Sequence, residues 1–451
     1  MQIISPASEA VLKILKQFKS GGATYRPLHY CVETPVDDGV LLFNLLTREL
    51  VLLTAEEYAH MDDLAELKDR WFLVPENANE KEYADLVKWV LSNRQKKTKN
   101  ITGYTIFPTT DCNARCFYCF ELGRSRIPMN EETSRKTVRY IKEHCGGEAI
   151  SISWFGGEPL YNQNAINIIC NGLRREGVEF KSTIISNGYL FDEHTVSKAV
   201  DIWNLKQVQI TLDGTEAVYN KTKAFIYKDG SAYQKVLTNI GLLLDSGISV
   251  QIRLNMDLYN AENLQELVQE LFDRFSGKKG LRVYAHHIFD GDKPMAGIHT
   301  DEEWEKRDAA LQRLQEKIAA CGLAGKGGIS KHLRMNHCMA DSGRSVTILP
   351  DGNIGLCEHF SETEFAGHLD REGLDSAMVA SWKEQMPQIP ECETCFYYPE
   401  CIKLKKCASG SVCFRQLRQD QLRKTKQQMK NEYERWRSKA LTEEEDEPVD
   451  C

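Results

Sequence analysis

Three cysteines, Cys112, Cys116 and Cys119, stand close together and follow directly the apolar run 101–108. This spacing supplies three thiolates from one loop. A structural zinc site takes four protein ligands, whereas a cubane iron–sulfur cluster can be held through three of its irons, which leaves the fourth iron free. The motif therefore predicts an iron–sulfur cluster, with a zinc knuckle or three reduced structural cysteines as the alternatives.

Seven more cysteines lie within 76 residues near the C-terminus, far more than this composition gives by chance. Cys338 and Cys357 flank a predicted strand–turn–strand that turns at Asp351-Gly-Asn353. The others are Cys392, Cys395, Cys401, Cys407 and Cys413. This density predicts metal binding. Iron–sulfur clusters are favoured here, although four of these thiolates would also satisfy zinc.

Six apolar runs, at 102–107, 149–155, 179–186, 207–212, 249–255 and 281–287, alternate with helical patterns centred near residues 138, 168, 196, 238 and 268. Repeated β-then-α units predict an α/β fold with a parallel sheet and right-handed crossovers. Function in parallel barrels lies at the C-terminal ends of strands. The first cysteine motif obeys this rule, since it follows the first run.

Polar and glycine-rich motifs end the next four strands. They are Gly156-Gly157-Glu158-Pro159 after the second, Ser186-Asn187 after the third, Asp213 after the fourth, and Arg253 with Asn255 at the end of the fifth. Glycines let the backbone approach a ligand closely, and a carboxylate accepts hydrogen bonds from an ammonium group. Each motif alone also suits an ordinary turn or a surface ion pair. His286 and His287 end the last strand and are interpreted as structural, with a place in the lining of the substrate cleft as the alternative.

The cysteine spacing, with an aromatic residue before Cys119, resembles the radical S-adenosylmethionine (radical SAM) enzymes. The resemblance implies a partial (β/α)6 barrel and a [4Fe–4S] cluster whose free iron is chelated by the amino and carboxylate groups of SAM. It also implies cofactor-binding roles at the strand ends. These place the SAM amino group at Gly156, Gly157, Glu158 and Pro159, the ribose at Ser186 and Asn187, the adenine at Tyr118 and Phe120, and the substrate near Asp213. A cation at the end of the fifth strand, where Arg253 and Asn255 stand, would also suit the SAM carboxylate.

The C-terminal cysteines resemble a SPASM domain, an extension that carries two auxiliary [4Fe–4S] clusters. The family pattern assigns Cys392, Cys395, Cys401 and Cys413 to the outer cluster, and Cys338, Cys357 and Cys407 to the inner one. The fully ligated version has an eighth cysteine shortly after the first, where this chain has residues 339–344 instead. The inner cluster is therefore expected to have an open iron, as a site for a substrate thiolate. The alternatives are a ligand that is not cysteine and a ligand from outside this run of cysteines.

Residues 1–95 predict a small separate module. Strands at 25–33 and 39–53, a capping box at Thr54 and Glu57, and a helix at 80–94 resemble a winged-helix module that recognises a precursor peptide by strand addition. A helical cap on the barrel is the alternative. The remaining boundaries are expected at 96–300 for the barrel, 301–415 for a bridging region and the SPASM domain, and 416–451 for a solvated charged helix with an acidic tail.

The composition restricts the class of protein. The chain has 451 residues, a net charge of −8 and 15 cysteines. The charge disfavours nucleic acid as a partner, no apolar run reaches the ~20 residues of a membrane span, and the N-terminus lacks a signal pattern. An odd number of clustered cysteines without an export signal favours a reducing cytoplasmic location over a disulfide framework.

The expected function is that of a peptide maturase. A 5′-deoxyadenosyl radical would abstract a hydrogen from a ribosomally made precursor peptide with a leader, and a thioether or other cross-link would form. Partners would include an external one-electron donor such as flavodoxin or ferredoxin. The alternatives are a sulfatase-maturase-like dehydrogenase acting on a protein serine or cysteine, and a non-enzymatic electron carrier. Glu358, which follows Cys357, is the candidate catalytic base; the alternative is a solvent-facing residue.

Overall fold

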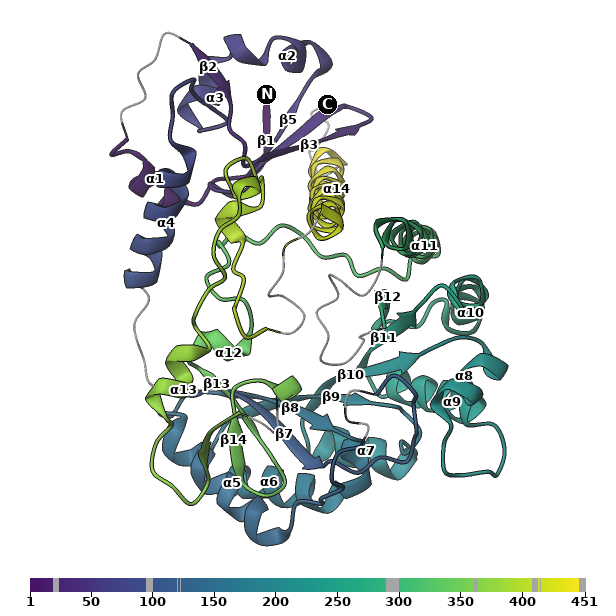
Figure 1. Cartoon of the computed structure of the whole chain (residues 1–451). Helices are drawn as coiled ribbons and strands as arrows, with labels where there is room; N and C mark the ends of the chain where they lie inside the picture. The colour runs from purple at the N-terminus through teal and green to yellow at the C-terminus, as the bar shows by residue number, and fades with distance from the viewer. Residues whose placement is uncertain are drawn as a thin grey trace, which may run out of the picture.

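The computed structural model describes residues 1–18, 24–94, 100–119, 121, 123–288, 300–360, 364–407, 413 and 415–445. An α/β barrel-like lobe lies at one end of the molecule and a smaller antiparallel sheet at the other, with the C-terminal segments between them (Figure 1). None of the helices in the described ranges combines the length and the apolar character that a bilayer span requires.

The six predicted parallel strands are confirmed, with their ends shifted by no more than about two residues. They are β7 (Gly103–Thr109), β8 (Ile150–Gly156), β9 (Phe180–Ser186), β10 (Leu205–Leu212), β11 (Ser249–Met256) and β12 (Leu281–His287). They lie side by side in chain order, each parallel to the next. Their C-terminal ends therefore share one edge, where parallel barrels carry their functional residues.

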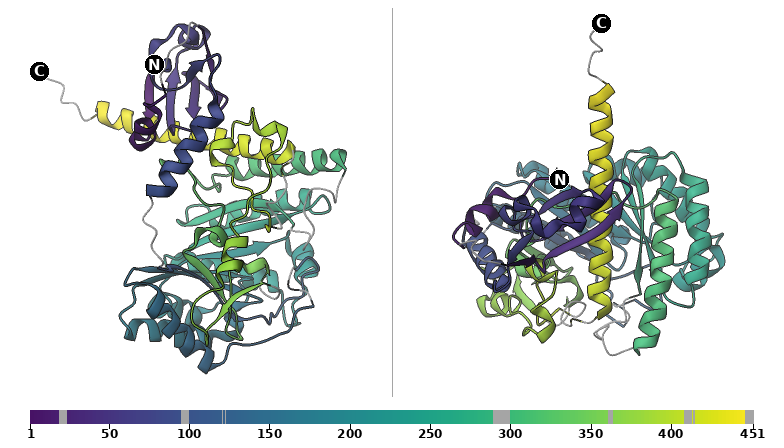
Figure 2. Two further views of the ribbon diagram at one scale, coloured as in Figure 1. Left: turned by 60° about the vertical axis from the view of Figure 1, so that its left-hand side comes forward. Right: turned by 90° about the horizontal axis from the view of Figure 1, so that it is seen from above.

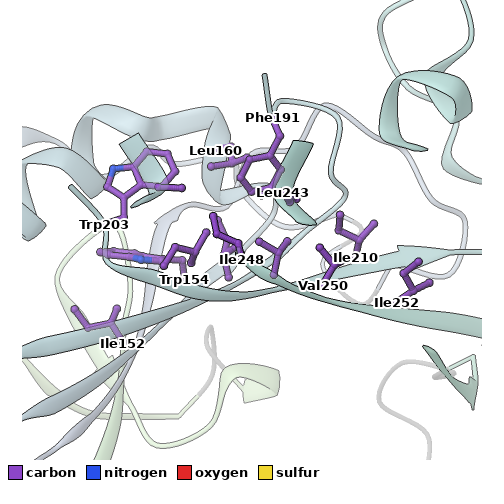
Figure 3. Packing of buried hydrophobic residues seen from close by; sticks show 14 of the residues in the cluster. Ile152, Trp154, Leu160, Phe191, Trp203, Ile210, Leu243, Ile248, Val250 and Ile252 are labelled. Atoms are coloured by element: carbon purple, nitrogen blue, oxygen red, sulfur yellow. The ribbon is translucent and has the colours of Figure 1, made fainter. Parts of the chain in front are cut away.

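Helices cover the outer face of this sheet. They are α5 (Glu131–His144), α6 (Gln163–Arg175), α7 (Glu193–Asp201), α8 (Glu216–Lys223), α9 (Ala232–Asp245) and α10 (Ala261–Phe275). Asn130, Asp192 and Ser231 cap three of them by accepting from the third backbone N–H. Apolar side chains such as Trp154 and Trp203, both fully buried, fill the space between sheet and helices (Figure 3). The short helix α8 was not predicted.

The C-terminal hairpin extends the same sheet. Strand β13 (Ser345–Ile348) pairs parallel with β7, and β14 (Asn353–Gly355) and β15 (Phe365–His368) continue antiparallel. The strand–turn–strand predicted around Asp351-Gly-Asn353 is confirmed. Its pairing with β7 was not foreseen, and it holds the segment that leads to Cys357 against the barrel.

The N-terminal lobe is a four-stranded antiparallel sheet in the order β1 (Gln2–Ser5), β5 (Glu49–Leu53), β4 (Gly39–Asn44) and β3 (Cys31–Val36). The helices are α1 (Glu9–Leu15), α2 (Ala55–Ala59), α3 (Ala65–Asp69) and α4 (Glu80–Arg94), and the capping box of Thr54 and Glu57 is confirmed. The single strand predicted at 25–33 is wrong. A turn after Pro27 divides it into β2 (Tyr25–Pro27), which pairs with β6 (Leu73–Pro75), and β3.

The C-terminal helix α14 (Arg415–Glu445) is not the solvated helix that its nine basic residues between 415 and 439 predict. Met429 is fully buried and Tyr433 is 5% exposed, and both join the apolar core of the N-terminal lobe. The Tyr433 hydroxyl donates to Asp38, and two views show α14 lying against the N-terminal sheet (Figure 2). The preceding helix α11 (Asp301–Ala320) lies over β12 and α10, with α12 (Met339–Ser342) and α13 (Ser376–Ser381) between α11 and α14 in the chain.

Candidate active site

A cavity of about 590 Å³ opens at the C-terminal edge of the parallel strands. Most residues predicted for the SAM site line it, together with the candidate base, although they come from five separate stretches of the chain. They are Cys112, Cys116, Tyr118, Cys119, Gly156, Gly157, Ser186, Asn187, Arg253, Asn255 and Glu358. The predicted cluster loop, the strand-end motifs and the candidate base thus meet in one space.

The cysteine loop is held by the side chain of Asp111 and by the C-terminal end of α8. Asp111 accepts from the Cys112 N–H at 2.8 Å, and the Arg115 N–H donates to the Lys223 carbonyl at 2.8 Å. Burial, followed by the charge of Glu158, raises the pKa of the Cys112 thiol to about 12, and burial also raises those of Cys116 and Cys119. Thiolates at these positions would be stabilised by the positive charge of a bound metal, and a donor set of three soft thiolates suits iron–sulfur.

The glycine pair after β8 lies directly against this loop. Gly156 has φ +112°, a conformation that L-residues with a side chain rarely adopt. A Cβ on Gly157 would lie 2.3 Å from the Asp111 carbonyl oxygen. Only glycine therefore lets this backbone approach the cysteine loop, and both glycines line the cavity beside the thiols.

The Glu158 side chain lies beneath the cavity wall rather than in it. Its carboxylate is fully buried and accepts from the Asn187 N–H at 2.8 Å, the Ser186 hydroxyl at 2.9 Å and the Leu160 N–H at 3.1 Å. Burial raises the pKa of Glu158 to about 7 despite these bonds. Glu158 thus fixes the ends of β8 and β9 relative to one another. The buried Pro159 next to it begins the short 3₁₀ helix η2 (Pro159–Asn162).

A buried ion pair that sequence analysis missed supports the cavity on the opposite side. Lys223, 2% exposed, lies 3.1 Å from the fully buried Asp213. Burial opposes the Lys223 charge, but Asp213, Tyr118 and Cys116 together raise its pKa well above the ordinary value. The Tyr118 hydroxyl donates to Asp213 at 2.5 Å, and Asn255 donates to both. Asp213 therefore anchors Tyr118, Lys223 and Asn255 at the cavity wall.

Alternate positions on neighbouring strands give the cavity a polar floor. The polar side chains come from β10, β11 and β12. Arg253 on β11 lies opposite Thr211 on β10 and opposite Tyr284 on β12. Gln209, Thr211, Arg253, Asn255, Tyr284 and His286 all line the cavity. The sequence indicates this polar face, because a strand buried on both faces is apolar throughout, whereas these strands alternate apolar and polar residues. Phe120, expected at the adenine, lies outside the described residues.

The C-terminal thiols separate into two groups. Burial raises the pKa of Cys357 to about 12, and the charges of Glu358, Cys338 and Cys407 add to it. Burial also raises the pKa of Cys395 and of Cys401. The charges of Cys413 and Cys392 add to the shift of Cys395, and the charges of Cys395 and Cys413 add to that of Cys401. These charge interactions link Cys357 with Cys338 and Cys407, and Cys395 with Cys392, Cys401 and Cys413. Among the described residues, no three histidine, cysteine or acidic side chains are gathered closely enough for a single metal ion.

Comparison with known families identifies the barrel. Residues 106–273 match the model of the Radical SAM superfamily. This range begins in β7 and ends in α10, so it contains the cysteine loop, the glycine pair and the strand ends that surround the cavity. The chain therefore contains a Radical SAM domain, the domain of a class of enzymes that use SAM and a [4Fe–4S] cluster.

Individual relatives differ in what they act on. By sequence, the chain is 24% identical over 283 residues to a GTP 3′,8-cyclase of Clostridium perfringens. The aligned region covers 59% of this chain and 83% of the relative. By structure, it resembles anSMEcpe with bound AdoMet and Cp18Cys peptide, with a TM-score of 0.53 and 16% identity over 76% of this chain and 99% of that one. It also resembles Streptococcus suis SuiB bound to the precursor peptide SuiA, with a TM-score of 0.52 and 13% identity over 84% and 94%. At these identities the two structures show a shared fold.

Proposed function

We propose that the protein is a radical SAM peptide maturase that forms a cross-link in a ribosomally made precursor peptide. The observation that carries this proposal is the composition of the cavity wall. Cys112 and Gly157 come from the radical SAM domain, whereas Glu358 and His359 come from the segment between the two halves of the inner thiol group. A substrate in this space lies between the SAM site and an auxiliary site, as oxidative coupling requires.

The residues at the cavity wall suit SAM. When bound, the cluster and SAM supply a 5′-deoxyadenosyl radical, which is the cofactor's own chemistry. The backbone of Gly156 and Gly157 lies beside the thiols and would hold the SAM amino group. Arg253 would pair with the SAM carboxylate, and Asn187 would contact the ribose. Tyr118, fixed by Asp213, would bound the adenine site and help to exclude water.

A peptide substrate is supported by the N-terminal lobe and by the solved relatives. Within the described residues, β3 pairs with β4 alone, so one edge of the sheet has backbone groups that a leader strand would satisfy. The two structural relatives are bound to peptides, and the superposition with SuiB covers 84% of this chain. These observations favour recognition of a leader over a purely structural cap.

Two auxiliary [4Fe–4S] clusters complete the proposed enzyme. The inner cluster would be held by Cys338, Cys357 and Cys407, and the outer one by Cys392, Cys395, Cys401 and Cys413. The outer group lies against the N-terminal lobe, where Lys88 donates to the Tyr398 carbonyl at 2.8 Å. The auxiliary clusters would accept the electron that bond formation releases, and an external donor such as flavodoxin or ferredoxin would reduce the SAM cluster.

Two other activities follow from specific observations. The likeness to anSMEcpe favours a radical dehydrogenase that acts on a peptidyl serine or cysteine. The sequence relationship to GTP 3′,8-cyclases favours GTP as substrate. The match to that relative covers 59% of this chain, whereas the structural relative bound to a precursor peptide covers 84%. The peptide substrate therefore accounts for more of the molecule.

The proposed function is tested by searching the neighbourhood of this gene for a small cysteine-rich reading frame and co-expressing the peptide that it encodes. We expect the peptide to lose a pair of hydrogens, and tandem mass spectrometry to show no fragmentation between the joined residues. A dehydrogenase would also remove a pair of hydrogens but would leave the backbone between residues fragmentable. Release of 5′-deoxyadenosine that is stimulated by GTP and not by the peptide would contradict the proposal.

The position of Glu358 gives a second test. Its side chain lines the cavity, where a carboxylate can receive the substrate proton as the cross-link forms. We expect Glu358→Gln to lower cross-linked product at least tenfold, since general-base catalysis contributes typically ~10²–10⁴-fold. Release of 5′-deoxyadenosine should continue. Glu372→Gln, at an exposed position of the same region, is the matched control. Product within about twofold of wild type would remove Glu358 from the mechanism.

A further inference from the structure

The inner thiol group contains three cysteines and therefore lacks one ligand for a fully coordinated cubane cluster. The structure places an imidazole beside it. The Nε2 atom of His337 lies 3.6 Å from the Sγ atom of Cys407, although the two residues are 70 positions apart in the chain. His337 also directly precedes Cys338, another member of the group. The inference that follows rests on the auxiliary clusters of the proposed function.

The backbone of His337 and Cys338 is held firmly. The Asp341 carboxylate accepts from the His337 N–H at 2.8 Å and from the Cys338 N–H at 3.0 Å. The Cys338 sulfur in turn accepts from the Ala340 N–H at 3.4 Å, which caps α12. Arg334 donates to the His337 carbonyl. Two adjacent side chains are therefore presented toward Cys407 from a fixed turn.

We infer that His337 is the fourth ligand of the inner auxiliary cluster and binds iron through Nε2. Imidazole replaces thiolate on iron in other iron–sulfur centres, so the chemistry is available to this side chain. The other nearby donors are engaged elsewhere. The Met339 sulfur accepts from the Thr105 hydroxyl at 3.6 Å on β7, and Glu358 lines the SAM-side cavity.

Ligation by His337 has two consequences. It closes the inner cluster, so a substrate thiolate would not bind this iron, and Glu358 would remain the group that faces the substrate. It also replaces an anionic thiolate by a neutral imidazole. A histidine-ligated centre has a higher reduction potential than its all-cysteine counterpart, which suits a cluster that accepts an electron from the substrate.

The test uses the full-length chain with Cys112, Cys116 and Cys119 replaced by alanine, so that signals from the SAM cluster are absent. Pulsed electron paramagnetic resonance of the reduced protein should show a strong nitrogen hyperfine coupling that changes on ¹⁵N-histidine labelling. The coupling should be lost in His337→Ala and retained in His332→Ala, an exposed histidine five residues earlier. His337→Cys should keep its iron, lose the nitrogen coupling and titrate at a lower potential.

Several outcomes would overturn the inference. One is a strong coupling that persists in His337→Ala. Another is a spectrum of the triple-alanine background, with His337 intact, that shows only the weak nitrogen coupling of a hydrogen-bonded imidazole. This result counts against the inference when the same protein holds about eight irons per chain. An iron content near zero in that background would instead contradict the auxiliary clusters themselves, and the proposed function with them. Iron analysis therefore separates failure of the inference from failure of the proposed function.

Discussion

Replacement of Cys112, Cys116 and Cys119 together by alanine is expected to abolish 5′-deoxyadenosine formation and leave the C-terminal clusters in place. The three thiols form one wall of the cavity, and they are the proposed ligands of the radical SAM cluster. The C-terminal thiol groups come from other segments, so they should fill independently. Iron should fall from about twelve to about eight per chain, counting four irons per cubane cluster.

Iron analysis and chromatography of the SAM cleavage products measure both parts of this prediction. Cys321→Ala is the matched control, because this half-buried cysteine lies outside the three thiol groups. It should change neither iron content nor SAM cleavage. If wild-type protein reconstituted under anaerobic conditions holds only about four irons per chain, the three-cluster assignment is wrong.

The buried pair of Asp213 and Lys223 carries the largest expected effect on stability. Asp213→Asn keeps the shape of the side chain and the hydrogen bond from Tyr118, but it leaves the Lys223 ammonium buried without its counter-ion. Removal of one partner of a buried pair costs roughly 3–5 kcal/mol. We therefore expect a marked fall in the denaturant midpoint, measured by circular dichroism on matched apo proteins.

The double variant Asp213→Asn with Lys223→Met should recover most of this loss, because neither charge then remains buried. Glu302→Gln is the control, since it breaks an exposed pair with Lys306 on α11. Such surface pairs contribute about 0.3–0.5 kcal/mol. A single Asp213→Asn variant as stable as this control would show that the pair has no structural role, and a double variant no better than the single would place the cost in lost hydrogen bonds.

Local patterns were sufficient to predict the parallel sheet and much of the site, whereas the closure of the sheet into a partial barrel was expected only from the family resemblance. The six strands carry apolar runs of the right length, and the chemistry-bearing residues follow their ends, so Cys112 and Gly157 were placed correctly beside each other. Lys223 could not be predicted, because a lysine in a short helix has no pattern that distinguishes burial from exposure. The burial of Glu158 under the cavity wall depends on Ser186 and Asn187, which lie on a different strand.

Contacts between segments far apart in the chain were the second feature that could not be predicted from the sequence. Nothing within Ser345–Ile348 indicates that its partner is β7, more than two hundred residues earlier. The same holds for α14, whose composition indicates a solvated helix although Met429 and Tyr433 are buried in the N-terminal lobe. The contact between His337 and Cys407 is likewise visible only in three dimensions. In each case the sequence shows the local element, and the tertiary partner decides its role.

The packing of α14 against the N-terminal sheet affects how the protein can fold while it is being synthesised on the ribosome. Domains generally fold as units during synthesis, with the N-terminal one first. Here the apolar core of the first lobe is completed by Ile329, Leu333 and Tyr398, and finally by Met429 and Tyr433. The lobe that is translated first therefore closes among the last, after the segments that carry the cluster thiols have emerged. Nascent chains that stall before α14 would display an unfinished apolar surface to chaperones, so quality control would act on truncated chains before they could engage a peptide.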